Sequence, residues 1–177
     1  DRPVDILHDG FDCVIRTGAL PEDGVIARPL GKLTMVNCAS PHYLTRFGYP
    51  QSPDDLTSHA IVRYTPHLGV HPLGFEVASV NGVQWFKSGG MLTVNSSENY
   101  LAAGLAGLGI IQIPRIAVRE ALRAGRLIEV LPGYRAEPLS LSLIYPQRRE
   151  LSRRVNLFMQ WLAGVMKEHP GLTDYTF

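Results

Sequence analysis

The sequence has 177 residues, of which 45% are hydrophobic and 19% charged, enough for one ordinary domain or two small lobes with a real core. A formal net charge of +1 gives no excess of positive charge that would attract nucleic acid or an anionic membrane. We therefore do not expect this chain alone to bind DNA. No apolar run is long enough for a bilayer and no signal peptide is recognisable, although the start at Asp1 without methionine predicts an upstream portion.

The first part of the chain alternates short apolar segments with turn residues. Gly31 separates two of these segments and predicts a turn between two strands. Ser40 and Ser52 are each followed by proline, a typical start of a helix, so we expect a helix after each of them. The segments that we predict to be strands lie at 11–16, 25–30, 33–39 and 60–64.

The segment 65–74 is predicted to be a loop, because it is rich in proline and glycine. It contains His67 and His71, whose separation would suit a metal site on a helix. A loop without a third ligand nearby argues against such a site, so we predict no metal. Strand patterns on either side of Asn81-Gly82 then predict a β-hairpin at the edge of a lobe.

The stretch 91–131 organises the rest of the chain. A short strand leads into Ser96 and Ser97, where a helix would begin, and small residues let that helix lie close to a sheet. The helix ends before the apolar run 110–113, which predicts a second strand parallel to the first. The pattern then repeats, with another helix and a third strand at 127–130.

The chain closes with a strand, 139–145, and a helix from about 151 to 167. This helix is apolar on two sides. A neighbouring lobe or a second subunit would cover the second side, and the sequence leaves both possibilities open. The first side comprises Val155, Phe158, Met159, Leu162, Val165 and Met166, and the second comprises Leu157 and Trp161.

Polar residues follow two strands of the middle segment. Open parallel sheets bind ligands beyond the carboxyl ends of their strands, where Tyr64 and Thr65 are expected. Asn95, Ser96 and Ser97 would add hydroxyls and amides at the positive end of a helix dipole, which favours an anion. Ordinary helix capping would use the same residues and is the alternative.

A second set of polar residues follows strands of the other lobe. Arg16 ends a strand, Thr17 and Gly18 extend the same rim, and Tyr145 ends the strand that returns to this lobe. An arginine can hold a carboxylate in two parallel hydrogen bonds, although pairing with acids of the adjoining loop is the alternative. Together the two sets predict a site for a small anionic metabolite with an apolar body.

Cys13 and Cys38 lie inside apolar strand patterns, where buried reduced thiols are expected and a redox sensor is the alternative. The sequence has no nucleophile elbow, phosphate loop or zinc motif, so we predict no catalytic residues and no cofactor. An enzyme built from residues scattered along the sequence would be recognised by turnover of whatever it binds.

The block NSSENYLAAGLAGLGIIQIPRIAVREALRAGRLIEVLP resembles the C-terminal effector-binding domain of LysR-type transcriptional regulators. Three further segments agree, in the same order: RPVDILHDGFDCVIRTGALPEDGVIARPLG, CASPHYLTRFGYPQSPDDLTSHAIVRY and LSLIYPQRRELSRRVNLFMQWL. The resemblance therefore covers nearly the whole chain.

The resemblance implies an α/β fold of periplasmic-binding-protein type II architecture, with two Rossmann-like subdomains joined by two crossing strands. Subdomain I would comprise 1–39 plus 140–177, and subdomain II 40–139. The family's domain ordinarily starts earlier. Subdomain I is therefore expected to be N-terminally truncated, without its first strand and helix, and the DNA-binding winged helix-turn-helix to be absent from this chain.

The function implied is that of a ligand-sensing regulatory domain, not an enzyme, which binds a metabolite in a cleft between the lobes to modulate DNA binding and transcription. Its expected partners are a small-molecule effector, further copies in a homodimer or tetramer of the full-length protein, and DNA only through the missing N-terminal domain. The expected location is cytoplasmic, without membrane contact. A solute-binding protein of a transport system, with the same bilobed fold, is the alternative, and an export signal would identify it.

Overall fold

The structure is a computed structural model that describes residues 6, 8–18, 24–65, 74–147, 152–167 and 172–173. It forms two compact units. Unit 1 comprises Met35–Glu137, and unit 2 comprises the described residues up to Thr34 and from Pro138 onward. The family resemblance implied divisions after residues 39 and 139.

Unit 1 is built on a mixed set of strands around β4. β7 pairs with β4 in parallel, and Ile61 of β4 forms a parallel bridge with Ile110, next to β8. β3 then pairs antiparallel with both β8 and β9. Because β7 and β8 each run parallel to β4, the predicted parallel arrangement of the strands flanking the helix is confirmed. The strands are β3 (Met35–Ala39), β4 (Ala60–Tyr64), β7 (Gly89–Val94), β8 (Ile111–Pro114) and β9 (Ile128–Glu129).

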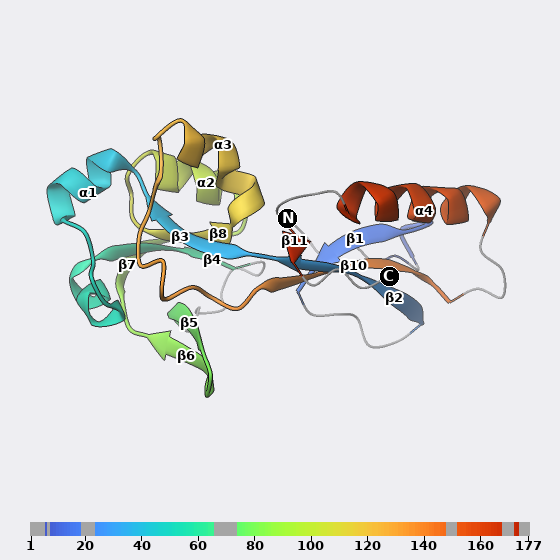
Figure 1. Ribbon diagram of the computed structural model, residues 1–177, viewed down its shortest axis with the longest axis horizontal. Coiled ribbons are helices and arrows are strands. Elements are labelled where there is room, and N and C mark those ends of the chain that lie inside the picture. The colour runs from blue at the N-terminus through green and yellow to red at the C-terminus, as the bar shows by residue number, and fades with distance from the viewer. Residues whose placement is uncertain are drawn as a thin grey trace. The chain divides into compact units, whose positions relative to one another are not determined.

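Helices α2 (Ser97–Leu105) and α3 (Arg115–Arg123) cover one side of these strands (Figure 1). Val118 of α3 is fully buried in the core that they form with the strands. Gly104 of α2 lies so close to Ile111 that a Cβ atom would be 2.6 Å from the isoleucine Cδ1. The small residues of α2 therefore let it approach the sheet, as the sequence predicted.

The other side of the strands carries the remaining elements of unit 1, which share a second core. As predicted, a helix follows Ser40, whose Oγ accepts a backbone N–H of α1. At the second predicted helix the carboxylate of Asp55 accepts a hydrogen bond from the N–H of Ser52 at 3.0 Å, and the helix is of the 3-10 type. These elements are α1 (Pro41–Phe47), η1 (Pro53–Ser58), β5 (Phe75–Ser79) and β6 (Gly82–Phe86).

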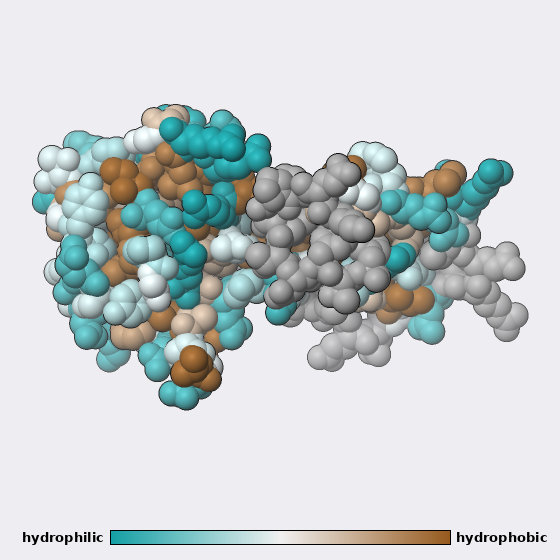
Figure 2. Space-filling view, in the orientation of Figure 1, coloured by the Kyte–Doolittle hydropathy of each residue, from teal (hydrophilic) through white to brown (hydrophobic). Residues whose placement is uncertain are grey.

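The hairpin of β5 and β6 is anchored at one end and exposed at the other. Phe75 pairs with Phe86 and is fully buried in the second core. Val80 and Val83, toward the turn, are exposed, and Figure 2 shows an apolar patch at this tip. The hairpin predicted around Asn81 is confirmed, and it forms a two-stranded sheet of its own.

In its described residues, unit 2 is an antiparallel sheet covered by the helix α4 (Figure 1). The strand order is β1, β10, β2, β11, and every neighbouring pair is antiparallel. α4 packs on this sheet through Val155, Met159 and Leu162, against Leu30 and Leu143 among others. The elements are β1 (Val14–Thr17), β2 (Val25–Leu33), β10 (Leu139–Pro146), α4 (Arg153–Lys167) and β11 (Leu172–Thr173).

The turn predicted at Gly31 is wrong, because β2 continues through this residue. Leu141 pairs with Gly31 while Ser142 pairs with Pro29, so Leu30 is the extra residue of a β-bulge. Gly31 has a φ of 130°, which a side chain would disfavour. The glycine therefore accommodates a bulge within one strand and does not separate two strands.

The apolar sides of α4 are divided differently from the prediction. Phe158 and Val165 are exposed, together with Leu157 and Trp161. The rings of Phe158 and Trp161 lie 5.7 Å apart. The sheet of unit 2 therefore covers a narrower stripe of the helix than the sequence suggested, and four apolar side chains remain outside it.

Candidate functional site

The predicted site residues of unit 1 meet at one edge of its strands. Tyr64 of β4 pairs with Val94 of β7, and the N–H of Thr65 donates to the carbonyl of Val94 at 2.9 Å. Asn95 and Ser96 follow Val94 directly, so both strands deliver polar residues to the same place. Parallel pairing explains this, because parallel strands end at a common edge.

The start of α2 uses one of these residues as a helix cap. Ser96 is the N-cap, and its Oγ accepts a hydrogen bond from the N–H of Asn99 at 3.4 Å. Ser97 and Glu98 begin the helix and are exposed. Capping is thus one established role of this segment, and its role in binding an anion stays a prediction.

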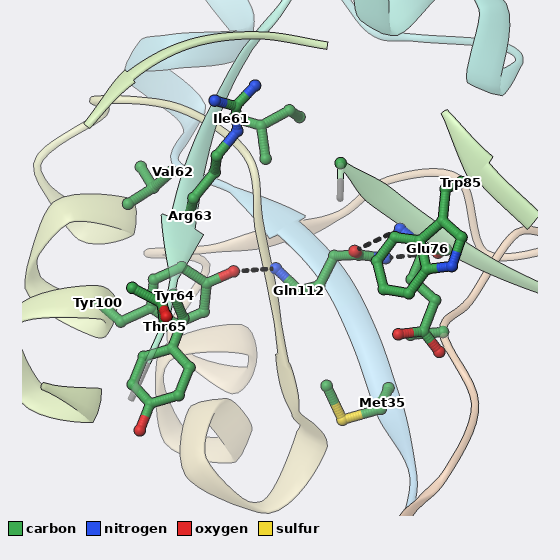
Figure 3. A pocket seen from close by; sticks show the side chains of 12 residues that line it. Met35, Ile61, Val62, Arg63, Tyr64, Thr65, Glu76, Trp85, Tyr100 and Gln112 are labelled. Atoms are coloured by element: carbon green, nitrogen blue, oxygen red, sulfur yellow. Dashed lines mark hydrogen bonds between the residues drawn. The ribbon is translucent and has the colours of Figure 1, made fainter. Parts of the chain in front are cut away.

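A pocket of about 320 Å³ lies within unit 1 and begins at the end of β4. Tyr64 and Thr65 line it, together with residues that the sequence did not single out (Figure 3). Such a volume is at the lower end of the range for small-molecule sites. The further lining residues that matter for its chemistry are Met35, Ile61, Arg63, Glu76, Trp85 and Gln112.

Five consecutive residues, 61–65, line this pocket, together with two residues of the hairpin. Ile61, Arg63 and Thr65 are two residues apart and therefore lie on the same face of β4. On the hairpin, Glu76 of β5 is paired with Trp85 of β6, so these two side chains are direct cross-strand neighbours. Both segments contribute to the lining of the pocket.

A hydrogen-bonded bridge fixes the hairpin to the strands. The side-chain amide of Gln112 accepts from the N–H of Glu76 at 2.9 Å and donates to the carbonyl of Glu76 at 2.8 Å. Its Nε2 also donates to Oδ1 of the fully buried Asn37 at 3.0 Å. Asn37 in turn donates to the carbonyls of Leu131 and Tyr134. The back of the pocket is therefore held in one arrangement.

Tyr100 of α2 also lines the pocket and is nearly buried. Its hydroxyl oxygen accepts a hydrogen bond from the N–H of Gln112 at 2.8 Å, and its ring lies 5.8 Å from that of Tyr64. Burial raises the pKa of the Tyr100 hydroxyl, which outweighs the opposite effect of this hydrogen bond. The phenol is therefore a neutral wall of the pocket near pH 7.

Arg63 is the cation of the pocket and is only partly satisfied. Its Nη2 donates to the carbonyl of Ser88 at 3.1 Å. Its Nε and the Oγ of Ser88 are buried without a hydrogen-bond partner among the described residues. None of the ion pairs within the described part of the chain includes Arg63. A charged residue within the apolar strand AIVRY was the sequence signal that could have identified it.

The predicted residues of unit 2 are not all brought together. Arg16 and Thr17 of β1 pair with Ser142 and Leu141 of β10, and Gly18 follows them directly. Arg16, Thr17 and Gly18 follow one another at the end of β1, and their role as a rim of the site stays a prediction.

Tyr145 lies elsewhere in unit 2. It is three residues beyond Ser142, the partner of Arg16, in the direction away from Gly18, and it packs against the core beneath α4. The expectation that strand ends converge is correct for parallel strands only, because an antiparallel pair delivers its carboxyl ends to opposite edges.

The two cysteines are free thiols, of which Cys38 is buried and Cys13 half-buried. Cys38 is fully buried, and burial, with a smaller effect of Glu129, raises its pKa to about 12. Burial also raises the pKa of Cys13, as does the charge of Asp12. A raised pKa disfavours the thiolate. The buried thiol expected from the sequence is therefore found at Cys38, whereas Cys13 is only half-buried.

The described residues contain no group of three His, Cys, Asp or Glu side chains that could hold a metal ion. His67 and His71, the pair considered from the sequence, lie outside the described residues. Among the helices of the described part of the chain, none combines the length and apolar character needed to cross a bilayer.

Comparison with known proteins places this geometry in a family. The model of the LysR substrate binding domain matches residues 1–167. The chain is 98% identical over 169 residues to the HTH-type transcriptional regulator YhjC of Escherichia coli (strain K12), covering 96% of this chain and 56% of that protein. It is 35% identical over 172 residues to an HTH-type transcriptional repressor of Pseudomonas aeruginosa (strain UCBPP-PA14), covering 96% and 54%.

The chain spans about half the length of the curated relatives it matches. Among solved structures, the regulatory domain of CrgA, a LysR-type transcriptional regulator from Neisseria meningitidis, is similar, with a TM-score of 0.77 and 24% identity. The match covers 90% of this chain and 78% of that chain. It shows the expected periplasmic-binding-protein type II fold. The chain belongs to the LysR substrate-binding domain family.

Proposed function

We propose that this chain is the ligand-sensing domain of a transcriptional regulator and that its effector is a small organic anion. The observation that carries the proposal is the pocket at the end of β4, where Tyr64 and Thr65 line a cavity that also contains Arg63. The start of α2, with Asn95, Ser96 and Ser97, lies beside the last residues of β4, and a helix N-terminus favours negative charge.

Binding without chemical conversion is the expected mode of action. The carboxylate of Glu76 accepts a hydrogen bond from the N–H of Glu137 at 3.0 Å, which holds it against the backbone. Burial keeps the hydroxyl of Tyr100 protonated. Neither group is arranged as a general base, which supports a sensor and not an enzyme.

The wider setting is part of the proposal. In the complete protein, effector binding would shift the balance between two conformations of this domain and so change how the protein acts on DNA. A dimer or tetramer and a cytoplasmic location are the expected context of that role. Arg16, Thr17 and Gly18 remain predicted effector contacts of unit 2, whereas Tyr145 packs against its core and does not join them.

A metabolite screen tests the sensing role. The domain would be mixed with panels of organic acids and neutral analogues, while unfolding temperature and product formation are both recorded. A ligand at a hundred times its Kd should stabilise the folded domain by about 2.7 kcal/mol. Stabilisation without product supports a sensor, whereas turnover of the bound compound would show an enzyme.

Once an anionic effector is found, Arg16→Ala tests the predicted rim of unit 2. We expect weaker binding with an unchanged unfolding midpoint, because the guanidinium would hold a carboxylate. Arg153→Ala, at an exposed position of the same unit, is the matched control. Equal affinity of both variants and the parent would remove Arg16 from the site.

A further inference from the structure

We infer that the pocket of unit 1 selects a monocarboxylate with a flat apolar body, whose carboxylate lies at Arg63 and whose body lies against Trp85. The inference rests on the proposed function, because it names the class of effector that this domain would sense. It follows from the cation, the apolar walls and the acid of the pocket, taken in turn.

Arg63 supplies the attraction for a carboxylate. Within the described residues its guanidinium has one hydrogen bond, to the carbonyl of Ser88, and forms no ion pair. Its Nε is buried without a partner, so the group has unmet capacity to donate. A guanidinium matches the planar geometry of a carboxylate better than any other side chain does.

The walls of the pocket favour a flat apolar body. The indole of Trp85 lines the pocket and is 47% exposed, although it is a large apolar group. Ile61 and the thioether of Met35 line other parts of the cavity (Figure 3). Aromatic side chains stack with planar groups, and methionine adapts to irregular apolar shapes.

Glu76 limits the ligand to one negative charge. It is the cross-strand neighbour of Trp85, so an acid stands next to the apolar wall. Its backbone is clamped by Gln112, and its carboxylate accepts the N–H of Glu137, which restricts movement away from the ligand. A second carboxylate on the ligand body would be repelled by Glu76, and Arg63 is the only lysine or arginine among the described residues that line the pocket.

The two tryptophans of the chain allow a direct measurement, because Trp85 is in unit 1 and Trp161 is in unit 2. In a Trp161→Phe background, the fluorescence of Trp85 reports on the pocket alone. The probes are benzoate, its neutral analogue benzamide, and the dicarboxylate phthalate. We expect saturable quenching by benzoate and an affinity lower by about tenfold or more for benzamide and for phthalate. Benzamide lacks the negative charge that Arg63 would bind, and the second carboxylate of phthalate would be repelled by Glu76.

Two substitutions in the same background assign the selectivity to residues. Arg63→Gln should weaken benzoate binding by about tenfold or more, whereas Arg123→Gln, at an exposed position of α3, should not change it. Glu76→Gln keeps an acceptor for the N–H of Glu137 and should bring phthalate affinity close to that of benzoate. This gain of binding tests the inference even if Arg63→Gln fails to fold.

Equal affinities for benzoate and benzamide, benzoate binding that survives Arg63→Gln, or no saturable quenching by benzoate would each overturn the inference. The proposed sensing function has a separate criterion. It stands if any compound of the metabolite panel stabilises the domain without being converted, and it fails if compounds are turned over or if none of the panel stabilises it.

Discussion

Units 1 and 2 both combine strands and helices, but they differ in strand direction and in what covers the strands. In unit 1, β7 and β8 each run parallel to β4, and elements on both sides cover the strands. In unit 2 all strand pairs are antiparallel, and α4 is the helix that covers them among the described residues. Parallel strands gather the residues at their carboxyl ends, and antiparallel strands separate them.

This difference explains which predicted residues converge. Tyr64 and Thr65 meet the segment after β7 because the two strands share a direction. Arg16 and Tyr145 lie on an antiparallel pair, so the ends of their strands point to opposite edges. A site built from strand ends can therefore be predicted from sequence only where the strand directions are already known.

The largest decrease in the free energy of unfolding is expected from a substitution at Gly109. This residue lies between α2 and β8, in the connection between the parallel strands of unit 1. This residue has a φ of 159°, and an added Cβ would be 2.6 Å from the carbonyl oxygen of Ala60. Gly109→Ala should therefore lower the free energy of unfolding by about 4 kcal/mol, since backbone cannot yield as a side chain can.

Urea unfolding followed by Trp85 in the Trp161→Phe background measures this effect. Gly133→Ala, where a Cβ would meet nothing within 4 Å, is the control. A decrease below about 1 kcal/mol for Gly109→Ala would mean that the backbone of Ala60 can move away, which would contradict the expected clash.

The stability of unit 2 should depend heavily on a few side chains, because α4 is the helix that covers its sheet in the described part of the chain. Met159 is 3% exposed and packs among the leucines beneath α4, so Met159→Ala should cost about 3 kcal/mol. Leu157→Ala, 56% exposed on the same helix, should change stability by no more than about 0.5 kcal/mol. Trp161 fluorescence in a Trp85→Phe background reports the unfolding, and similar losses for the two variants would refute this description of α4.

A smaller decrease in the free energy of unfolding is expected when the hydrogen-bonded bridge that holds the hairpin of unit 1 is removed. Gln112→Ala removes the partners of Glu76 and of Asn37 Oδ1, and leaving such buried groups unpaired should cost about 2 kcal/mol. Gln84→Ala, on the exposed strand β6, is the control. Stability equal to that of the control would show that the hairpin does not need the bridge.

Much of the fold follows from local signals in the sequence, while the pocket does not. Ser40, Ser52 and Ser96 marked helix starts, and Asn81-Gly82 marked a hairpin, because capping and turn preferences act over a few residues. The pocket depends on contacts between distant segments, such as Gln112 with Glu76. No local pattern encodes that contact. Strand alternation would place Arg63 on one face only after the partner of that face is known.

The smallest effect concerns pH and should distinguish the two units. His59 of unit 1 is buried, with its Nδ1 3.1 Å from the hydroxyl of Tyr43, and burial lowers its pKa despite the opposing charge of Asp55. Below the ordinary histidine pKa of about 6.5 the unfolded chain takes up a proton that the folded state resists. The contribution to stability is therefore complete above that pH and is lost as the pH falls toward the folded pKa.

Urea midpoints between neutral and mildly acidic pH measure this dependence, read from Trp85 for unit 1 and from Trp161 for unit 2. The midpoint of unit 1 should fall with pH, and His59→Gln should flatten the slope, because the titrating group is removed. His42→Gln, at an exposed position of α1, should leave the slope as it is. If His59→Gln keeps the parent slope, the acid sensitivity of unit 1 arises elsewhere. If both tryptophans report one common midpoint at every pH, the two units unfold together and their separate stabilities have no independent meaning.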